Sequence, residues 1–323
     1  MSPNDAMTLD FETLSATQRR FATAFEGNFQ ADVNLSRYTS SRVGGPAEMM
    51  VTVYNATELA MAVELAYSTN TRYFILGGGS NILVSDQGVS GVVILNRAKE
   101  VSYRSAGASI ICTAESGVNI STLARRCVSK GLGGLEWAIA IPGTVGGAVV
   151  GNSGAFGGDM SDCLMVANIL EPGKGVRTWS VDELAYDYRA SILKREQGKL
   201  APRRVVLSAE LLLKPESESA LVARANAFNE KRKTTQPTGA TMGSMFKNPP
   251  NFYAGYLIEA AGLKGYRNGG ASISELHANF FVNDGTATAE DIRQLMAEAF
   301  HVVREKFHVD LDPEVEMVGM WEF

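Results

Sequence analysis

Apolar side chains recur along the chain at the spacing of amphipathic helices, with short apolar runs between them. Ser15 and Gln18 form the pattern of a capping box, and Phe21 and Phe25 then share one face, which predicts a short helix. A second helix is predicted after Thr57, which we take as its N-cap. Its predicted apolar face consists of Leu59, Ala60, Val63, Ala66 and Tyr67.

Three further helices are predicted downstream. One covers about 120–130 and stops at Gly131, and another covers about 220–231. The strongest pattern runs from Ala289 to about Phe307 behind the cap Thr288. Short apolar runs predict strands at 48–54, 72–76, 91–95, 100–105, 109–116, 163–170, 204–213 and 315–321. This mixture of helices and mostly short strands predicts an α+β fold.

Length, composition and charge narrow the class of protein. With 323 residues, 45% of them hydrophobic and 20% charged, the chain suits two or three domains with sizeable cores. The polar segment 214–219 marks a domain boundary near residue 215. Acidic residues outnumber basic ones and give a net charge of −5, which argues against a nucleic-acid binder.

Cysteine content and the N-terminal residues indicate the compartment. The three cysteines are too few for a disulfide framework or a four-cysteine zinc site, and we expect them to be reduced core residues. Asp5 and Asp10 stand where a signal peptide has its basic end. The uncharged stretch 137–158 contains a proline and seven glycines, which do not suit a membrane helix. A cytoplasmic protein without membrane insertion is therefore expected.

Two glycine-rich stretches suggest a site for phosphate groups. The first, GGGSN at 77–81, follows an apolar strand directly, and glycines let backbone N–H groups approach a ligand closely. The second comprises IPGTVGGA at 141–148 and GNSGA at 151–155. Together they favour a ligand with two adjacent phosphates, such as a dinucleotide. Tight turns and close packing of strands and helix ends remain the alternative, and neither the G-x-G-x-x-G nor the phosphate-loop pattern occurs.

The order of these stretches carries a family resemblance. TSSRVGGPA at 39–47, GGGSN at 77–81, IPGTVGGA at 141–148 and NSGA at 152–155 resemble the FAD domain of the vanillyl-alcohol-oxidase (PCMH) type. Over about 34–319 the motifs are similar to those of the UDP-N-acetylenolpyruvoylglucosamine reductase family of peptidoglycan synthesis. The implied fold is α+β, with two FAD-binding lobes and a C-terminal α+β substrate-binding domain. The implied limits are 1–27 for an N-terminal extension, 28–90 and 91–214 for the lobes, and 215–323 for the substrate domain.

The same resemblance implies the ligands. FAD would lie with its pyrophosphate between the two glycine clusters, and because the three histidines lie away from these loops we expect it to be non-covalent. NADPH would be the reductant, and UDP-N-acetylglucosamine enolpyruvate would be reduced to UDP-N-acetylmuramate. The implied cofactor contacts are Gly77, Gly78, Gly79, Ser80, Asn81, Ile141, Pro142, Gly143, Thr144, Gly146, Gly147, Ala148, Asn152, Gly154 and Ala155.

Reducing an enol ether conjugated to a carboxylate requires a cation near the carboxylate and a proton donor near the carbon that becomes negative. By resemblance, Arg189 in YRAS (188–191) pairs with the carboxylate. Ser244 in GSMFKNP (243–249) would protonate the carbon after hydride arrives from flavin N5. Glu314 would assist that protonation or hold the carboxylate region.

From the residues alone the catalytic assignments stay open. Arg189 has the pattern of a surface arginine after a strand, and Ser244 that of a turn residue. Glu316 competes with Glu314, because residues two apart face the same side of a strand.

Other residues have an implied contact role and a structural alternative. Tyr188, Lys247, Asn248 and His277 align with substrate contacts, although His277 equally fits a structural hydrogen bond. The run KRK at 231–233 is typical of a helix C-terminus, and it would also attract the diphosphate of a nucleotide. His301 and His308 lack further ligands nearby, so no metal site is predicted.

The chain departs from the family pattern at two points. Phe156 stands where the family has tyrosine, and the short stretch between Arg189 and Ser244 resembles the form of the reductase without a tyrosine loop over the substrate. Two rival functions remain: an FAD-dependent oxidase of the same fold, and a non-catalytic nucleotide-binding protein that keeps the glycine loops. Composition and spacing by themselves indicate only a dinucleotide-binding α+β protein.

Overall fold

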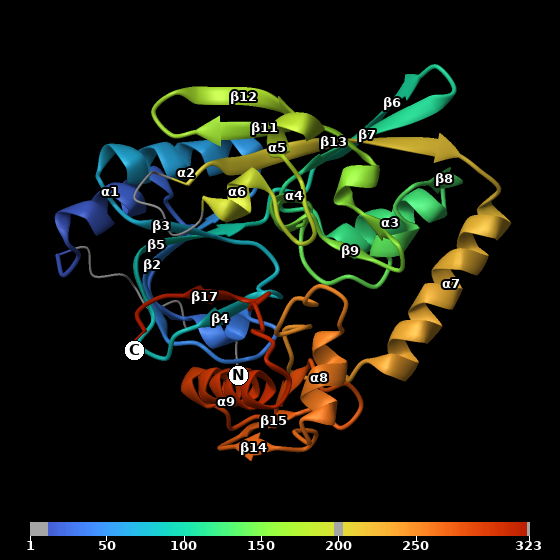
Figure 1. Ribbon diagram of the computed structural model, residues 1–323. Helices are drawn as coiled ribbons and strands as arrows, with labels where there is room; N and C mark the ends of the chain where they lie inside the picture. The colour runs from blue at the N-terminus through green and yellow to red at the C-terminus, as the bar shows by residue number, and fades with distance from the viewer. Residues whose placement is uncertain (1–11, 197–202, 322–323) are drawn as a thin grey trace, which may run out of the picture.

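The computed structural model describes residues 12–196 and 203–321 (Figure 1). The expected N-terminal extension lies partly outside these residues, as do the last two residues of the expected C-terminal domain. The helices in the described part are α1 (Ala16–Ala24), α2 (Ala56–Ser68), α3 (Ile120–Val128), α4 (Val145–Gly151), α5 (Val181–Leu184), α6 (Ile192–Arg195), α7 (Glu218–Thr235), α8 (Ala254–Ala260) and α9 (Ala289–Phe307). Short 3₁₀ turns cover Leu35–Tyr38, Glu136–Ala138 and Met160–Asp162.

The strands are short, as the sequence predicts. They are β1 (Phe29–Asn34), β2 (Pro46–Val53), β3 (Tyr73–Leu76), β4 (Ile82–Val84), β5 (Val89–Asn96), β6 (Val101–Ala106), β7 (Ser109–Glu115), β8 (Leu132–Gly133), β9 (Gly154–Ala155), β10 (Gly158–Asp159), β11 (Leu164–Glu171), β12 (Gly175–Ser180), β13 (Val205–Pro215), β14 (Arg267–Asn268), β15 (Ala271–Ile273), β16 (Phe281–Asn283) and β17 (Glu316–Val318). The α+β character is confirmed.

Helix ends follow the predicted caps with one exception. Ser15 with Gln18 forms a capping box on α1, and Thr288 forms one on α9. The cap of α2 is Asn55 rather than Thr57, because the Asn55 side chain accepts a hydrogen bond from the Glu58 amide. The predicted apolar face of α2 is also one residue too long, since Tyr67 is 45% exposed.

The first sheet is built around parallel strands. Its order is β1-β2-β5-β3, with β2 and β3 parallel to β5 and β1 antiparallel to β2. Helices α1 and α2 contribute apolar residues to a core with these strands, which Leu170 and Val205 of the second sheet join. The predicted lobe limit at residue 90 falls inside β5, and the domain limits stay predictions.

The second sheet has the order β12-β11-β13-β7-β6, with β8 pairing to β13, and its pairings are antiparallel. Its core takes in α3, α4 and all three cysteines, which are buried and free, as expected. The uncharged stretch 137–158 contains α4, a helix that the sequence pattern does not predict because its glycines and valines show no helical period. Thr144 caps this helix by accepting from the Gly147 amide.

The C-terminal region returns to the first sheet. Helix α7 runs from the end of β13 to this region (Figure 1), and its buried Leu221 and Ala225 belong to the core of the second sheet. Helices α8 and α9 and the β14-β15-β16 sheet share a core with Val43 and Leu83. Strand β17 then pairs in parallel with β4, which brings the segment before β17 beside the first glycine loop. No helix in the described residues is long and apolar enough to cross a membrane.

Candidate active site

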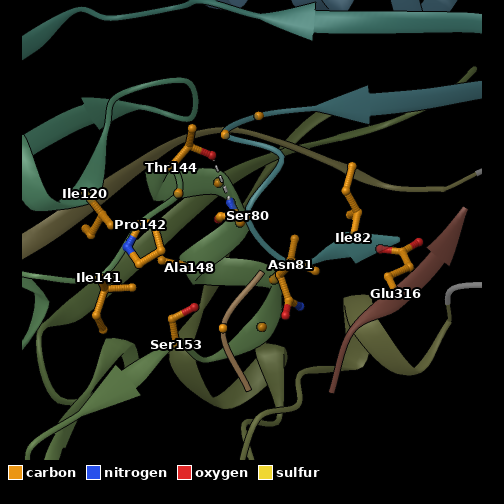
Figure 2. A pocket seen from close by; sticks show the side chains of 18 of the residues that line it. Ser80, Asn81, Ile82, Ile120, Ile141, Pro142, Thr144, Ala148, Ser153 and Glu316 are labelled. Carbon is orange, nitrogen blue, oxygen red and sulfur yellow. Dashed lines mark hydrogen bonds between the residues drawn. The ribbon is translucent and has the colours of Figure 1, made fainter. Parts of the chain in front are cut away.

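A cavity of about 480 Å³ opens where the two sheets meet the C-terminal region. It is lined by the loop after β3, the loop before α4, β9, the segment 203–206, the end of α7, and the segments around Ser244 and Glu314. Figure 2 shows the loop with Ser80 and Asn81 between the Ile141–Pro142 side of the cavity and Glu316. The predicted catalytic residues Arg189, Ser244 and Glu314 all line it.

The two glycine clusters meet at very close range. A Cβ on Gly78 would stand 2.9 Å from the Gly143 Cα, and one on Gly77 would stand 2.7 Å from the Thr144 Oγ1. Gly79 has a φ of +61°, and a Cβ there would overlap the Tyr38 carbonyl. The loops can approach each other in this way only because these positions carry no side chain.

The first loop presents its amides as unused donors. Within the described residues, none of the backbone N–H groups of residues 77–81 donates a hydrogen bond to a protein acceptor. Such a run of amides on a cavity wall suits phosphate oxygens. Two lining side chains add buried atoms without a partner among the described residues, Nη1 of Arg204 and Oε1 of Gln236. These donors and acceptors, with the glycine cradle, fit a bound dinucleotide such as FAD.

Every predicted cofactor contact lines the cavity except Asn152. Asn152 is buried in a left-handed conformation at the end of α4, and its Nδ2 donates to the Asp187 carbonyl at 3.2 Å. Asp187 and Ala190 exchange two backbone hydrogen bonds around the turn that carries Arg189. Asn152 therefore anchors the arginine turn to α4.

Arg189 is held on two sides. Its φ of +54° lies in the left-handed region, and its Nη2 donates to the Gly154 carbonyl. Its Nε lies 3.0 Å from Oε1 of Glu314, and both side chains are mostly buried. Tyr188, which precedes it, is 49% exposed, does not line the cavity, and has its ring centroid 5.4 Å from the Arg189 guanidinium carbon.

Ser244 and Glu314 lie on two paired segments. The Glu314 amide donates to the Met245 carbonyl at 2.9 Å, and the Lys247 amide donates to the Asp312 carbonyl at 2.8 Å. Ser244 itself forms a bridge with Phe280, another lining residue. In the described part of the chain the Ser244 hydroxyl has no hydrogen-bond partner, so it is available to a ligand in the cavity.

Glu314 sits among cations. Burial raises the pKa of its carboxyl above the usual value, and the positive charges of Arg189, Lys194 and Lys247 oppose that rise. Its backbone carbonyl accepts from Asn81 Nδ2 at 3.2 Å and from Lys194 Nζ at 3.4 Å. The first glycine loop and α6 therefore both hold the segment that carries Glu314.

Glu316 lines the same cavity, as its position two residues along the chain predicts. It differs from Glu314 in its partner, because its Oε1 lies 2.8 Å from Nη1 of Arg203. The structure thus pairs each glutamate with its own arginine.

Three predicted substrate contacts have other partners and do not line the cavity. Lys247 forms an ion pair with Asp312, with 2.6 Å between Nζ and Oδ2. The Oδ1 of Asn248 accepts from the Ala254 amide and caps α8. Both residues lie directly beyond Ser244 on the segment that pairs with 312–314.

His277 has the structural hydrogen bond that the sequence left open. Its Nδ1 accepts from the Asn279 amide at 3.2 Å, and its ring packs against Phe280. Burial lowers the pKa of the imidazole, so it is neutral at pH 7. No cluster of His, Cys, Asp or Glu suited to a metal ion occurs among the described residues.

Phe156, where the family pattern has tyrosine, lines the cavity. Its ring stacks on Phe228 of α7, with 4.6 Å between centroids and 5° between planes. The substitution removes a hydroxyl and leaves a flat apolar contact that fixes the β9–β10 turn against α7.

Further residues line the cavity that the sequence patterns do not single out, among them Lys194, Arg203, Arg204 and Gln236. For Lys194 the sequence does hold a signal, because it stands three residues after Ser191 of the YRAS motif. The Ser191 hydroxyl caps α6 by accepting from the Lys194 amide, which fixes the lysine close to the motif. The others lie on segments far apart in sequence, and only the folded chain brings them together.

Comparisons with known proteins agree with this geometry. Residues 47–178 match the family model described as FAD binding domain, and 235–318 match UDP-N-acetylenolpyruvoylglucosamine reductase, C-terminal domain. The reductase of that name from Nostoc sp. is 42% identical over 290 residues, which cover 89% of this chain and 86% of the relative. That from Chloroflexus aggregans is 41% identical and covers 88% and 95%.

A solved structure is similar over nearly the whole chain. The crystal structure of UDP-N-acetylenolpyruvylglucosamine reductase from Thermus caldophilus has 35% sequence identity and a TM-score of 0.74. The match covers 88% of this chain and 97% of that one.

Proposed function

The chain belongs to the UDP-N-acetylenolpyruvoylglucosamine reductase family, and we propose that the described cavity is where it reduces its enolpyruvyl substrate. It is an FAD-dependent oxidoreductase of peptidoglycan precursor synthesis, with NADPH as reductant. The proposed substrate is UDP-N-acetylglucosamine enolpyruvate and the proposed product UDP-N-acetylmuramate. One hydride and one proton add across the alkene, and NADPH supplies the electron pair.

The observation that carries this proposal is the convergence of three side chains on one cavity. Arg189, Ser244 and Glu314 come from separate parts of the chain and line the same space as both glycine loops. The reaction needs a cation, a proton donor and a cofactor cradle together.

We assign the chain's own groups as follows. Residues 77–81 supply amides for the FAD pyrophosphate, and the close packing of Gly78 on Gly143 shapes the cradle. When bound, FAD supplies hydride. Arg189 holds the substrate carboxylate and stabilises the negative charge that spreads onto it.

Ser244 donates the proton to the substrate carbon opposite the site of hydride addition. A serine hydroxyl is a weak acid, so the cationic surroundings formed by Arg189 and Lys194 must favour its ionised form. Glu314 holds Arg189 in place through the 3.0 Å contact and lies in the same cavity as the hydroxyl. We assign this carboxyl a supporting role in the protonation that Ser244 carries out.

The proposal is tested by an anaerobic absorption titration of the purified holoenzyme. Addition of NADPH should bleach the flavin bands, and the enolpyruvyl sugar nucleotide should restore them. A flavin that is reduced but reoxidised only by oxygen would indicate an oxidase. A protein that stays colourless after incubation with FAD would indicate a binding protein without this activity.

A further inference from the structure

Lys194 is a cavity residue with an incomplete set of partners. It lies on α6, and its Nζ makes one hydrogen bond, at 3.4 Å, to the Glu314 carbonyl. Burial lowers the pKa of its ammonium group, and the charge of Glu314 opposes that effect. Because the side chain is partly buried in the wall, an anion in the cavity would stabilise its charged form.

The other charged groups near it are already paired. Glu314 forms an ion pair with Arg189, and Glu316 forms one with Arg203. Arg204, also in the wall, pairs with Glu196 at 3.2 Å. Within the described residues no carboxylate lies within ion-pair distance of Lys194, so the wall around Glu314 keeps one positive charge without a counterion.

Two N–H groups of Arg189 already have protein acceptors. Its Nε is engaged by Glu314 and its Nη2 by the Gly154 carbonyl. A guanidinium has five N–H donors, and here the single N–H of Nε and one N–H of Nη2 are engaged, which leaves the two of Nη1 and the second of Nη2. Part of the Arg189 guanidinium is thus committed to Glu314 and Gly154, and a second cationic donor beside it would strengthen the contact with a substrate carboxylate.

We propose that Lys194 is that donor: its ammonium and the guanidinium of Arg189, both held on Glu314, jointly bind the carboxylate of the enolpyruvyl group. The inference rests on the proposed function. Lys194 is favoured over Arg232, the other lining cation without a carboxylate partner among the described residues, because Lys194 contacts the same glutamate as Arg189. Arg232 lies at the far end of α7.

The experiment measures binding by isothermal titration calorimetry to the FAD-loaded enzyme, with two probes. UDP-N-acetylmuramate carries the carboxylate, and UDP-N-acetylglucosamine lacks it. In the Lys194→Met variant the affinity for UDP-N-acetylmuramate should fall roughly 10- to 100-fold, the loss expected for a charge-assisted hydrogen bond. Affinity for UDP-N-acetylglucosamine should not change. Lys194→Arg should recover part of the loss, because it restores the charge.

Matched controls separate this effect from damage to the fold. Lys174→Met changes an exposed lysine that does not line the cavity, and both affinities should stay at wild-type values. If the Met variant does not retain FAD, Lys194→Gln takes its place in the same comparison. Unchanged affinity for UDP-N-acetylmuramate, or an equal loss for both probes, would overturn the role of Lys194. A wild-type enzyme that does not distinguish the probes would overturn the proposed function instead.

Discussion

The Nε atom of Arg189 lies 3.0 Å from Oε1 of Glu314, and both side chains are mostly removed from solvent. The arginine comes from a left-handed turn beside β9, whereas the glutamate precedes β17. Removing one member of a buried pair leaves the other charge without compensation, so substitutions at either position will affect both groups. A change in turnover alone does not show which of the two residues causes it, so each variant needs separate measurements of flavin reduction, reoxidation and stability.

Ser244→Ala should separate proton donation from the rest of the cycle. Because Ser244 lines the cavity and has no hydrogen-bond partner in the described residues, removing its hydroxyl should leave the fold and flavin content unchanged. Turnover should fall by roughly 10²- to 10⁴-fold, the usual contribution of general acid catalysis. Stopped-flow absorbance should show normal flavin reduction by NADPH and slow reoxidation by the enolpyruvyl substrate.

The control for this variant is Ser102→Ala, at an exposed position on β6. It should retain full activity. Reoxidation by substrate in Ser244→Ala at nearly the wild-type rate would contradict the assignment of Ser244 as the proton donor.

Glu314→Gln and Glu316→Gln distinguish the two cavity glutamates. The first change removes the partner of Arg189 and a carboxyl assigned to assist the protonation, so turnover should fall by roughly 10²-fold or more. The second removes only the ion pair with Arg203, a partner that is 37% exposed, and should cost less than about 1 kcal/mol of stability. Steady-state kinetics compare the turnover of the two variants. A larger loss of turnover in Glu316→Gln than in Glu314→Gln would reverse the assignment.

Glu314 should also make stability depend on pH in a defined direction. Burial raises the pKa of its carboxyl in the folded protein above the ordinary value of 4.5, so the folded state binds more protons than the unfolded state above that pH. The stabilisation from this group is fully present below pH 4.5 and is lost as the pH rises through the folded pKa.

Urea unfolding of the wild type and of Glu314→Gln, at a series of pH values from about 4 upward, measures this effect. The free energy of unfolding of the wild type minus that of the variant should decrease with increasing pH. A difference that grows with pH would mean that the attraction of Arg189 outweighs burial and holds the pKa below its ordinary value.

Local sequence patterns predicted those parts of the fold that depend on local interactions. The caps Ser15 and Thr288 and the stripe on α9 follow from spacing alone, and the structure confirms them. The cap of α2 was misplaced because Asn55 and Thr57 both suit an N-cap, and only the backbone geometry selects Asn55. Helix α4 was missed because glycine-rich sequences show no apolar period.

Some residues of the candidate site also follow from the sequence, whereas others do not. Motif order was enough to name Arg189, Ser244, Glu314 and both glycine loops, and the fold brings them to one cavity. Lys247, Asn248 and His277 have protein partners outside the cavity wall, and their role as substrate contacts stays a prediction. Arg203 and Gln236 reach the cavity through long-range packing, which no local pattern encodes.

Gly78→Ala should test the cradle between the glycine loops. The added methyl would stand 2.9 Å from the Gly143 Cα, a backbone atom that can yield only if the whole loop shifts. Overpacking of this kind typically costs about 1–3 kcal/mol. Because the strain lies in the loop that holds the cofactor, it should weaken FAD binding by roughly tenfold or more. Gly107→Ala is the control, because its φ of +63° imposes backbone strain while a Cβ there meets no atom within 4 Å. Fluorescence of released flavin gives both dissociation constants: Gly107→Ala should keep wild-type affinity, and a Gly78→Ala enzyme that does the same would show that contact between the loops does not shape the FAD site.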